Sequence, residues 1–436
     1  KKMNLTFKKI FIKDFINLKE EKSYFYNDCY KKNFTNLNKD FLIILKEKSL
    51  NSQIKDIEIL KSTVKPKISL DLSYDIYKNE NVIGNPWIKN YVLSEDKVGI
   101  YLILKQNIYD GGIYNSKNKM SIIDKNTEFY NLENEKQEFY SKVYILYYDI
   151  LKEEELLKLK KEMLKKLELD KFNAELYLKN EKIIYTDLLK IGVEILNIEQ
   201  EILSINNNIA ILKNEMKKNT GFSIDDRELI IPKELDEKKL EGIKSLIEKA
   251  YKNEIELKKL ENNLEKIKYE NEILRSTKKP NISLQGLYGI DIGQGEEFDN
   301  WKLSINISQN IYEGGKSKKT EEKLQIEKEK INISKLEIKE NIKNNLEKSL
   351  KKLSSLSLIK EKNIKNLRFN EEILKVEELK YNNETIDIND LISARLNLMT
   401  ANQNYIRSNY EYEQEKVRIY RLIGEIYNSG GENEKQ

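Results

Sequence analysis

The most constraining feature of this chain is a seven-residue stretch that occurs twice. It reads QNIYDGG at Gln106–Gly112 and QNIYEGG at Gln309–Gly315, 203 residues further on. Each copy follows an alternating apolar and polar run and precedes a long charged pattern with helical periodicity. The chain is therefore expected to turn from a strand into a long helix at equivalent places in two repeats.

The duplication extends in both directions from this stretch. At the same offset, Asp187–Leu189 (DLL) matches Asp390–Ile392 (DLI). Upstream, Ser62–Leu70 (STVKPKISL) matches Ser276–Leu284 (STKKPNISL) at an offset of 214. The difference between the offsets must lie between the two strands of each copy, where a change of length is typical of a surface hairpin loop.

Five segments are expected from this arrangement. They are an N-terminal segment with a helix (1–61), repeat 1 (62–221), a linker and helix (222–275), repeat 2 (276–424) and a C-terminal tail (425–436). Each repeat reads strand, loop, strand, Gly-Gly, helix, turn, helix.

The strands alternate with a period of two. In the first strand Ile68, Leu70, Leu72 and Tyr74 alternate with polar residues; in the fourth, the apolar row is Trp301, Leu303, Ile305 and Ile307. At about 10–12 residues each they are long enough to cross a bilayer at a tilt, but a soluble sheet with one wet face fits equally well. Four strands cannot close a barrel, and an open sheet edge is excluded from lipid. A soluble sheet and a barrel shared between identical chains therefore both remain open.

Composition favours long helices over ordinary globular domains. Charged residues make up 34% of the chain and hydrophobic residues 39%, with 4 prolines. A helix from Ile113 to about Asn180 would be ~100 Å long. Two returning helices carry coiled-coil seams with steps of three and four. These are Leu188, Ile191, Ile195, Ile198, Ile202, Ile205, Ile209 and Leu212, then Leu391, Ala394, Leu398, Ala401, Tyr405, Ser408 and Tyr412.

The same composition excludes several function classes. The 77 basic and 73 acidic residues nearly cancel, so no nucleic-acid partner is expected. With no histidine, one cysteine (Cys29) and no phosphate-binding glycine motif, we expect no enzyme, no metal site and no cofactor. The N-terminus lacks the apolar core of a signal peptide, so we expect either a mature form or a protein that is not exported. No apolar run suits a transmembrane helix, and crossing a membrane would therefore require a barrel.

Four glycines stand where the strands give way to the long helices. Gly111 and Gly112, and Gly314 and Gly315, are expected to form sharp corners that need a positive φ or close backbone packing. A structural role is expected for them rather than a catalytic, metal or phosphate-binding role.

The order of these motifs resembles the TolC-like outer-membrane efflux protein family, the outer membrane factors. The resemblance rests on the Pro-x-Ile-Ser-Leu strands, the Gly-Gly corners and DLISARLNL at Asp390–Leu398, in an arrangement that occurs twice between about Lys39 and Gly424. It implies an α+β membrane protein and homotrimer, with four transmembrane strands per chain in a shared twelve-stranded barrel. A long α-helical coiled-coil tunnel would continue the barrel into the periplasm.

The resemblance also implies a function and partners. Such a trimer is the passive exit duct of a tripartite efflux or type I secretion system in the bacterial outer membrane. Its partners would be a periplasmic adaptor, an inner-membrane pump and the lipid of the outer membrane. Because the wall of a duct is generic, the choice of substrate is expected to belong to the pump and adaptor. The competing hypothesis is a coiled-coil structural or adhesive envelope protein without a conducting pore.

By the same resemblance, the gate lies at the tips of the helical hairpins. Asp390 and Asp187 match the aspartates beyond the two tips, Tyr381 matches the tyrosine before the second tip, and Asp387 and Glu384 add negative charge. Threefold rings of these aspartates would form a negative constriction and titrate as a coupled set with raised pKa values. The alternative is that Asp187 and Asp390 each cap the N-terminus of a returning helix.

Overall fold

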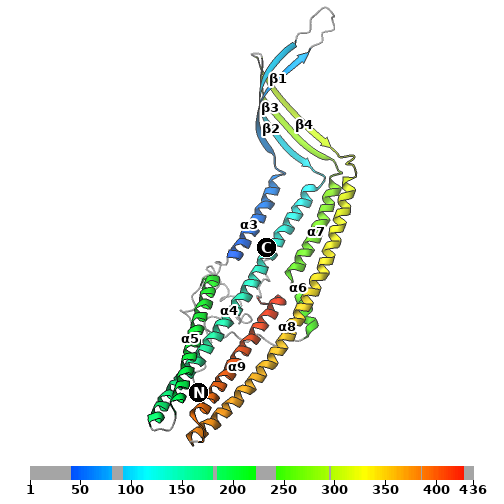
Figure 1. The fold of residues 1–436 in the computed structure, drawn as a ribbon. Helices are drawn as coiled ribbons and strands as arrows, with labels where there is room; N and C mark the ends of the chain where they lie inside the picture. The colour runs from blue at the N-terminus through cyan, green and yellow to red at the C-terminus, as the bar shows by residue number, and fades with distance from the viewer. Residues whose placement is uncertain are drawn as a thin grey trace, which may run out of the picture. The chain divides into compact units, whose positions relative to one another are not determined.

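The computed structural model describes residues 41–80, 92–179, 184–221, 242–293, 296–383 and 385–426 (Figure 1). Within these residues the second half of the chain repeats the strand, strand, long helix and returning helix of the first. The elements are α3 (Phe41–Ser62), β1 (Lys67–Glu80), β2 (Val92–Tyr109), α4 (Ile113–Lys179), α5 (Tyr185–Thr220), α6 (Ile243–Asn253), α7 (Ile255–Ser276), β3 (Asn281–Gly293), β4 (Glu296–Ser308), α8 (Lys316–Asn382) and α9 (Ile388–Leu422).

The chain divides into two compact units, and each takes segments from both repeats. The helical unit comprises the described residues of ranges 1–47, 131–255 and 337–436. The sheet unit comprises those of ranges 48–130 and 256–336. The repeat boundaries were defined by matching sequence, whereas the two units are defined by contacts in space. The boundaries therefore remain a prediction.

The sheet unit contains one antiparallel sheet in the order β1-β2-β3-β4. Leu70 pairs with Leu102, Leu102 with Tyr288, and Tyr288 with Trp301. Because directly paired residues share a face, this row crosses all four strands on one side of the sheet. The four side chains are half to three-quarters exposed. The predicted apolar alternation is confirmed, and it forms one continuous exposed apolar face.

The strands are longer than the sequence predicted. They have 14, 18, 13 and 13 residues, because pairing continues into segments that were expected to be loops. Glu80 still pairs with Val92, and Gly293 with Glu296. Backbone groups pair for as long as the two strands stay adjacent, and polar side chains at the end of the hairpin do not prevent it.

The two QNIY(D/E)GG stretches differ in structure although their sequences match. In the first, β2 continues to Tyr109, whereas the second lies wholly beyond the end of β4 at Ser308. The first stretch therefore lies partly within its strand, whereas the second follows its strand, as the sequence pattern predicted. β2 is held on both sides by β1 and β3, but β4 is an edge strand with one neighbour. Its pairing ends where Ser308 meets Asn281, the first residue of β3.

All four corner glycines have positive φ, from 61° to 100°. At Gly111 the corner also needs room, since a Cβ there would lie 2.6 Å from the carbonyl oxygen of Ser276. The preceding Asp110 caps the new helix, because its carboxylate accepts hydrogen bonds from the backbone N–H of Gly112 (3.0 Å) and of Tyr114 (2.6 Å). The change from strand to helix is thus built from a left-handed backbone and a local cap.

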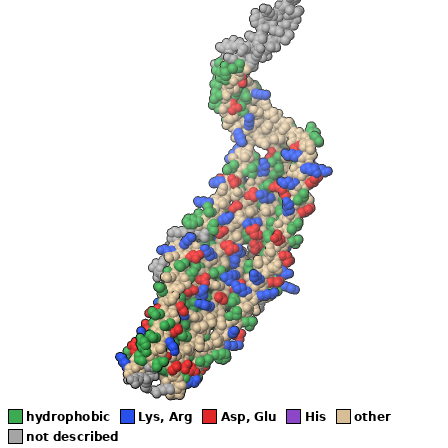
Figure 2. All heavy atoms as spheres, viewed as in Figure 1, with side chains coloured by type: hydrophobic (Ala, Val, Ile, Leu, Met, Phe, Trp, Pro, Cys, Tyr) green, Lys and Arg blue, Asp and Glu red, His purple; other side chains and the backbone are tan. Residues whose placement is uncertain are grey.

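The long helices have the predicted extent. α4 and α8 each contain 67 residues, about 100 Å at the ordinary rise per residue. Lys, Arg, Asp and Glu side chains are interspersed over their surfaces, as expected for solvated helix faces (Figure 2). Among the residues that the structure describes, no helix has the length and apolar character needed to cross a membrane.

The predicted seams are the buried faces of the returning helices. In α5, Ile191, Ile198 and Ile209 are buried, and the other seam residues pack around them. Two core clusters of this region combine side chains from α4, α5 and α9. The small residues Ala394, Ala401 and Ser408 of the α9 seam are buried as well, in agreement with the close approach that their size permits.

Candidate functional site

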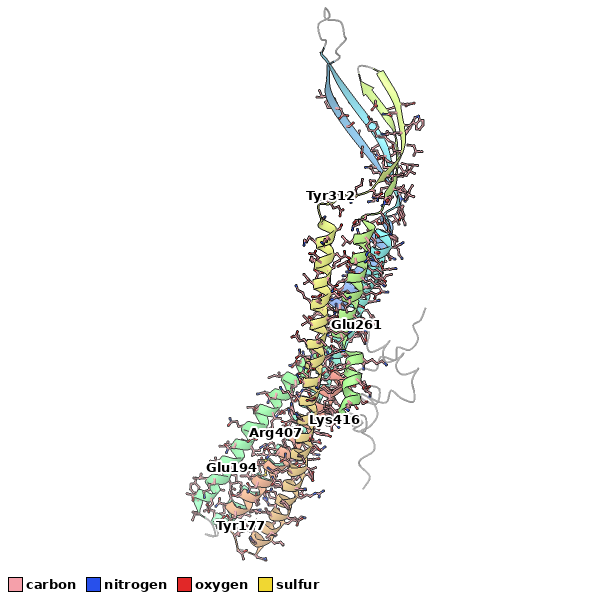
Figure 3. The ribbon with its side chains drawn as sticks, turned by 90° about the vertical axis from the view of Figure 1, so that its right-hand side faces the viewer. Tyr177, Glu194, Glu261, Tyr312, Arg407 and Lys416 are labelled. Carbon is pink, nitrogen blue, oxygen red and sulfur yellow. The ribbon has the colours of Figure 1, made fainter. Side chains whose placement is uncertain are left out.

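The predicted site lies at the two hairpin tips of the helical unit. One tip joins the end of α4 at Lys179 to the start of α5 at Tyr185. The other joins the end of α8 at Asn382 to the start of α9 at Ile388. Tyr177, one turn or less from the first tip, is labelled in Figure 3. Glu181 and Glu384, which the sequence places at the tips themselves, lie outside the described residues.

Asp187 links the two tips. Its Oδ1 accepts a hydrogen bond from Asn389 Nδ2 at 2.9 Å and lies 3.4 Å from Lys190 Nζ. The bond from Asn389 is the main reason that the pKa of the Asp187 carboxyl lies below its ordinary value. Lys190 and the backbone of Ile184 lower the pKa of Asp187 further, while burial opposes them. Within the single chain, neutral and cationic donors thus favour the charged carboxylate, and the raised pKa expected for a threefold ring of aspartates remains a prediction.

Neither Asp187 nor Asp390 is the N-cap of its helix. The N-cap of α5 is Ile184, which makes no side-chain capping bond, so Asp187 lies inside the first turn. The N-cap of α9 is Asp387, whose Oδ1 accepts a hydrogen bond from the backbone N–H of Asp390 at 3.0 Å. The capping role weighed for Asp390 thus belongs to Asp387. Asp390 is exposed in the first turn of α9, where a negative charge favours the helix dipole.

Tyr381 is half-buried at the end of α8, beside the second tip. Burial raises the pKa of its hydroxyl to about 12, with smaller contributions from Tyr177 and Asp170 and an opposing one from Arg395. Tyr381 is therefore a neutral hydroxyl throughout the physiological pH range. It packs against the apolar clusters that join α8 and α9 with α4 and α5.

Next to Tyr381 is a buried ion pair that sequence reasoning missed. Arg395 of α9 is bonded through Nη1 to Oδ2 of Asp170 on α4, and its Nη2 lies 3.6 Å from Glu378 Oε1 on α8. Asp170 is 5% exposed. The pair ties the returning helix of repeat 2 to the long helix of repeat 1. A signal was present: Asp170 continues the apolar seam of Met163 and Leu167, at a position where a charge requires a partner.

The structure therefore separates the described gate residues into three groups. Asp187 contacts the second tip through Asn389, while Tyr381 belongs to the cluster around Arg395 and Asp170. Asp387 and Asp390 are joined to each other by the cap of α9. No group of three or more Cys, Asp or Glu side chains in the described parts of the chain is placed to hold a metal ion.

No protein-family model matches the sequence, and a search of curated proteins finds no match. Solved structures do match. The CmeC outer membrane channel of Campylobacter jejuni aligns with a TM-score of 0.70 at 14% identity, over 91% of this chain and 86% of that chain. The outer membrane protein VceC of Vibrio cholerae aligns with a TM-score of 0.70 at 10% identity, over 91% of this chain and 95% of that chain.

A third structure is the open state of the MtrE outer membrane channel of Neisseria gonorrhoeae. It aligns with a TM-score of 0.67 at 14% identity, over 90% of this chain and 88% of that chain. The chain has the fold of the outer-membrane channels. The outer-membrane channel fold confirms the α+β class with a small antiparallel sheet and long helices. It also confirms, at the level of the fold, the resemblance drawn from the duplicated motifs.

Proposed function

We propose that this chain forms a homotrimeric outer-membrane channel of the TolC-like family. It serves as the exit duct of a tripartite efflux or type I secretion system and binds a periplasmic adaptor and an inner-membrane pump. Its helical hairpins form a periplasmic tunnel that opens at the tips. The single observation that carries this proposal is a sheet with one continuous exposed apolar face and two open edges.

The open edges argue for assembly. β1 pairs only with β2 and β4 only with β3, so the outer edges of β1 and β4 have no partner strand within the described sheet. Ile68 and Ile307, near one end of these strands, are each about two-thirds exposed. An apolar face belongs in lipid, but lipid excludes an unpaired edge. Pairing β4 of one copy with β1 of the next satisfies both edges, and closure of three copies gives twelve strands.

Exposed seams on the helices support assembly as well. Beside its buried seam, α5 carries a second apolar row with steps of four, three and seven: Leu189, Val193, Leu196 and Leu203, each at least half exposed. Hydrophobic side chains interrupt the charged surface over α5 in Figure 2. α8 carries a corresponding row near the other tip at Phe369, Ile373, Val376 and Leu379. Two exposed heptad-like rows on one unit are typical of helices that pack against further helices.

The tips fit the role of a gate. Asn389 with Asp187, and Arg395 with Asp170, connect the helices of repeat 1 to those of repeat 2 within one chain. Opening the tunnel at this end requires the two hairpins to separate or shift together. Polar contacts between two hairpins have discrete bonded and broken arrangements, as a two-state gate requires. Asp187, Asp390, Asp387, Glu384 and Tyr381 remain the residues proposed for this constriction.

The test is conductance of the purified protein in planar lipid bilayers. Discrete, voltage-stable conductance steps are expected for the unmodified protein. The variant Leu303→Lys/Ile305→Lys places charges on the apolar face of β4, at a cost of about 2–4 kcal/mol for each at the centre of a bilayer, and is expected not to insert. The matched control Ser304→Lys/Asn306→Lys changes the opposite face of the same strand and is expected to insert and conduct.

The outcome separates the two functions considered for this chain. If the unmodified protein does not conduct and the two double variants do not differ in membrane insertion, the channel is contradicted. A coiled-coil scaffold would then be favoured. Insertion that depends on which face of β4 carries the lysines would leave the scaffold without support.

A further inference from the structure

Two lysines face each other directly across the sheet. Lys67, the first residue of β1, pairs with Lys105 of β2, and both are exposed. They lie on the side opposite the apolar face, because Ile68 and Leu104, their neighbours in sequence, form the adjoining pair on that face. Directly opposed like charges in an antiparallel sheet destabilise it. The pair is therefore not explained by the stability of the fold.

No carboxylate neutralises this pair within its own row. The row continues from Lys105 to Gln285 of β3 and Ser304 of β4. The adjacent row toward the hairpin loops contains Leu287 and a third lysine, Lys302, which is also exposed. The end of the polar face that is nearer to the helices thus carries three lysines within two rows of the sheet.

The acidic residues near this end are either distant or occupied. Asp71 is four residues along β1 from Lys67, about 13 Å at the strand rise, which exceeds the Debye length of about 8 Å at physiological ionic strength. Asp291 is buried, and it is bonded to Tyr101 and lies 3.2 Å from Asn300 Nδ2. Asp110 caps α4. The three lysines therefore form a cationic group at this end of the polar face, and Asp71 and Asp291 lie in separate rows nearer to the hairpin loops.

A neighbouring copy would not neutralise the lysines either. If β4 of one copy lies against β1 of the next, the residues beside Lys67 come from the last part of β4 and the segment after it. Residues 304–310 read SINISQN and contain no carboxylate. Closing the sheet therefore brings the lysine pairs of successive copies into one ring without adding a counter-charge.

We propose that Lys67 and Lys105 form a cationic ring at the helix-side end of the barrel lumen, and that this ring gives the channel a preference for anionic solutes at that level. The inference rests on the proposed function, since the polar face lines a lumen only if the sheet closes between copies. Rings of lysine or arginine are the means by which pores favour anions. An anion in the ring also relieves the repulsion between the opposed lysines.

The test is the reversal potential of single channels in a KCl gradient. Lys67→Gln/Lys105→Gln should lower the ratio of chloride to potassium permeability by about two- to three-fold at low ionic strength, with a smaller change in concentrated salt because the charges are screened. Lys67→Arg/Lys105→Arg keeps the charges and should leave the ratio unchanged. Each single glutamine variant should give an intermediate shift, which provides a measurement if the double variant assembles poorly.

The measurement can either support or overturn the lysine ring. A shift toward potassium in the glutamine variants and none in the arginine variant supports the ring. Conducting channels whose reversal potential does not move in any glutamine variant would overturn the ring and leave the proposed channel intact. An unmodified protein that forms no channel would overturn both.

Discussion

Asn389 donates a hydrogen bond to Asp187 Oδ1 over 2.9 Å, and this contact joins the first turn of α9 to the first turn of α5. Asp187 and Asp390 occupy equivalent positions in the two repeats, and Asn389 immediately precedes Asp390. The tips of the two repeats are thus connected within one chain by a carboxylate and a neutral donor. Asp187 therefore contacts the neutral side chain of Asn389, the residue before its equivalent Asp390, and this contact is attractive.

Replacing the donor should loosen the tips. In Asn389→Ala the Asp187 carboxylate loses its shortest hydrogen bond, and bonds to charged groups contribute about 1.5–3 kcal/mol. We expect roughly a tenfold or larger increase in the ratio of open to closed channels in bilayer recordings. Asn397→Ala changes an exposed asparagine on the same helix and should have no effect. Equal open fractions in the two variants would show that the Asn389–Asp187 hydrogen bond does not hold the channel closed.

The same contact predicts how opening depends on pH. The folded-state pKa of Asp187 is lowered, so its stabilising effect is complete above the ordinary value of 3.8 and is lost as pH falls through the lowered value. Conductance should therefore stay constant between about pH 5 and 8 and rise only in more acidic solution. A coupled aspartate ring with raised pKa values would instead shift the transition above the ordinary value. A conductance titration distinguishes the two cases.

Arg395→Ala should destabilise the helical unit strongly. It leaves Asp170 buried without its cation, which typically costs about 3–5 kcal/mol. Replacing both members together, as Asp170→Leu/Arg395→Met, should be close to neutral, because a buried pair contributes little net stability against apolar residues of similar size. The midpoint of thermal unfolding, followed by circular dichroism, gives the comparison. Arg407→Ala, on the exposed side of α9 (labelled in Figure 3), is the control and should change little.

The same glycine-to-alanine substitution can be compared at the two strand-to-helix corners. Gly111→Ala and Gly314→Ala both force alanine into a left-handed backbone, at about 1–2 kcal/mol. Only at Gly111 would the new Cβ also meet Ser276 O, at 2.6 Å, whereas at Gly314 it meets nothing within 4 Å. Gly111→Ala should therefore lower the unfolding midpoint clearly more than Gly314→Ala. Equal losses would indicate that the backbone angle alone determines the cost.

Local pattern was enough to predict the long elements. The absence of proline and the heptad steps after Ile113 predicted α4, and the alternation around Trp301 predicted β4 with its apolar and polar faces. These features depend on residues close in sequence, where periodicity separates the apolar face of an element from its polar face. The resemblance of the duplicated motifs then indicated the fold that the solved structures share.

The details that sequence missed depend on contacts between distant segments. β2 continues to Tyr109 inside its copy of the repeated stretch because it has a neighbouring strand on each side, whereas β4 lies at the edge of the sheet and ends before its copy. The N-cap of α9 depends on the backbone angles of Asp387, which sequence does not distinguish from those of Asp390. The Arg395–Asp170 pair requires α9 to lie against α4, and only the unusual seam position of Asp170 indicated it beforehand.

The central claim is that the open edges of the sheet close between three copies. Electron cryo-microscopy of the protein, extracted from the outer membrane in detergent, tests this claim most directly. We predict a threefold particle in which β4 of each copy pairs with β1 of the next, giving a closed barrel of twelve strands. A particle that stays monomeric or dimeric, with the edges of β1 and β4 unpaired, would contradict the account.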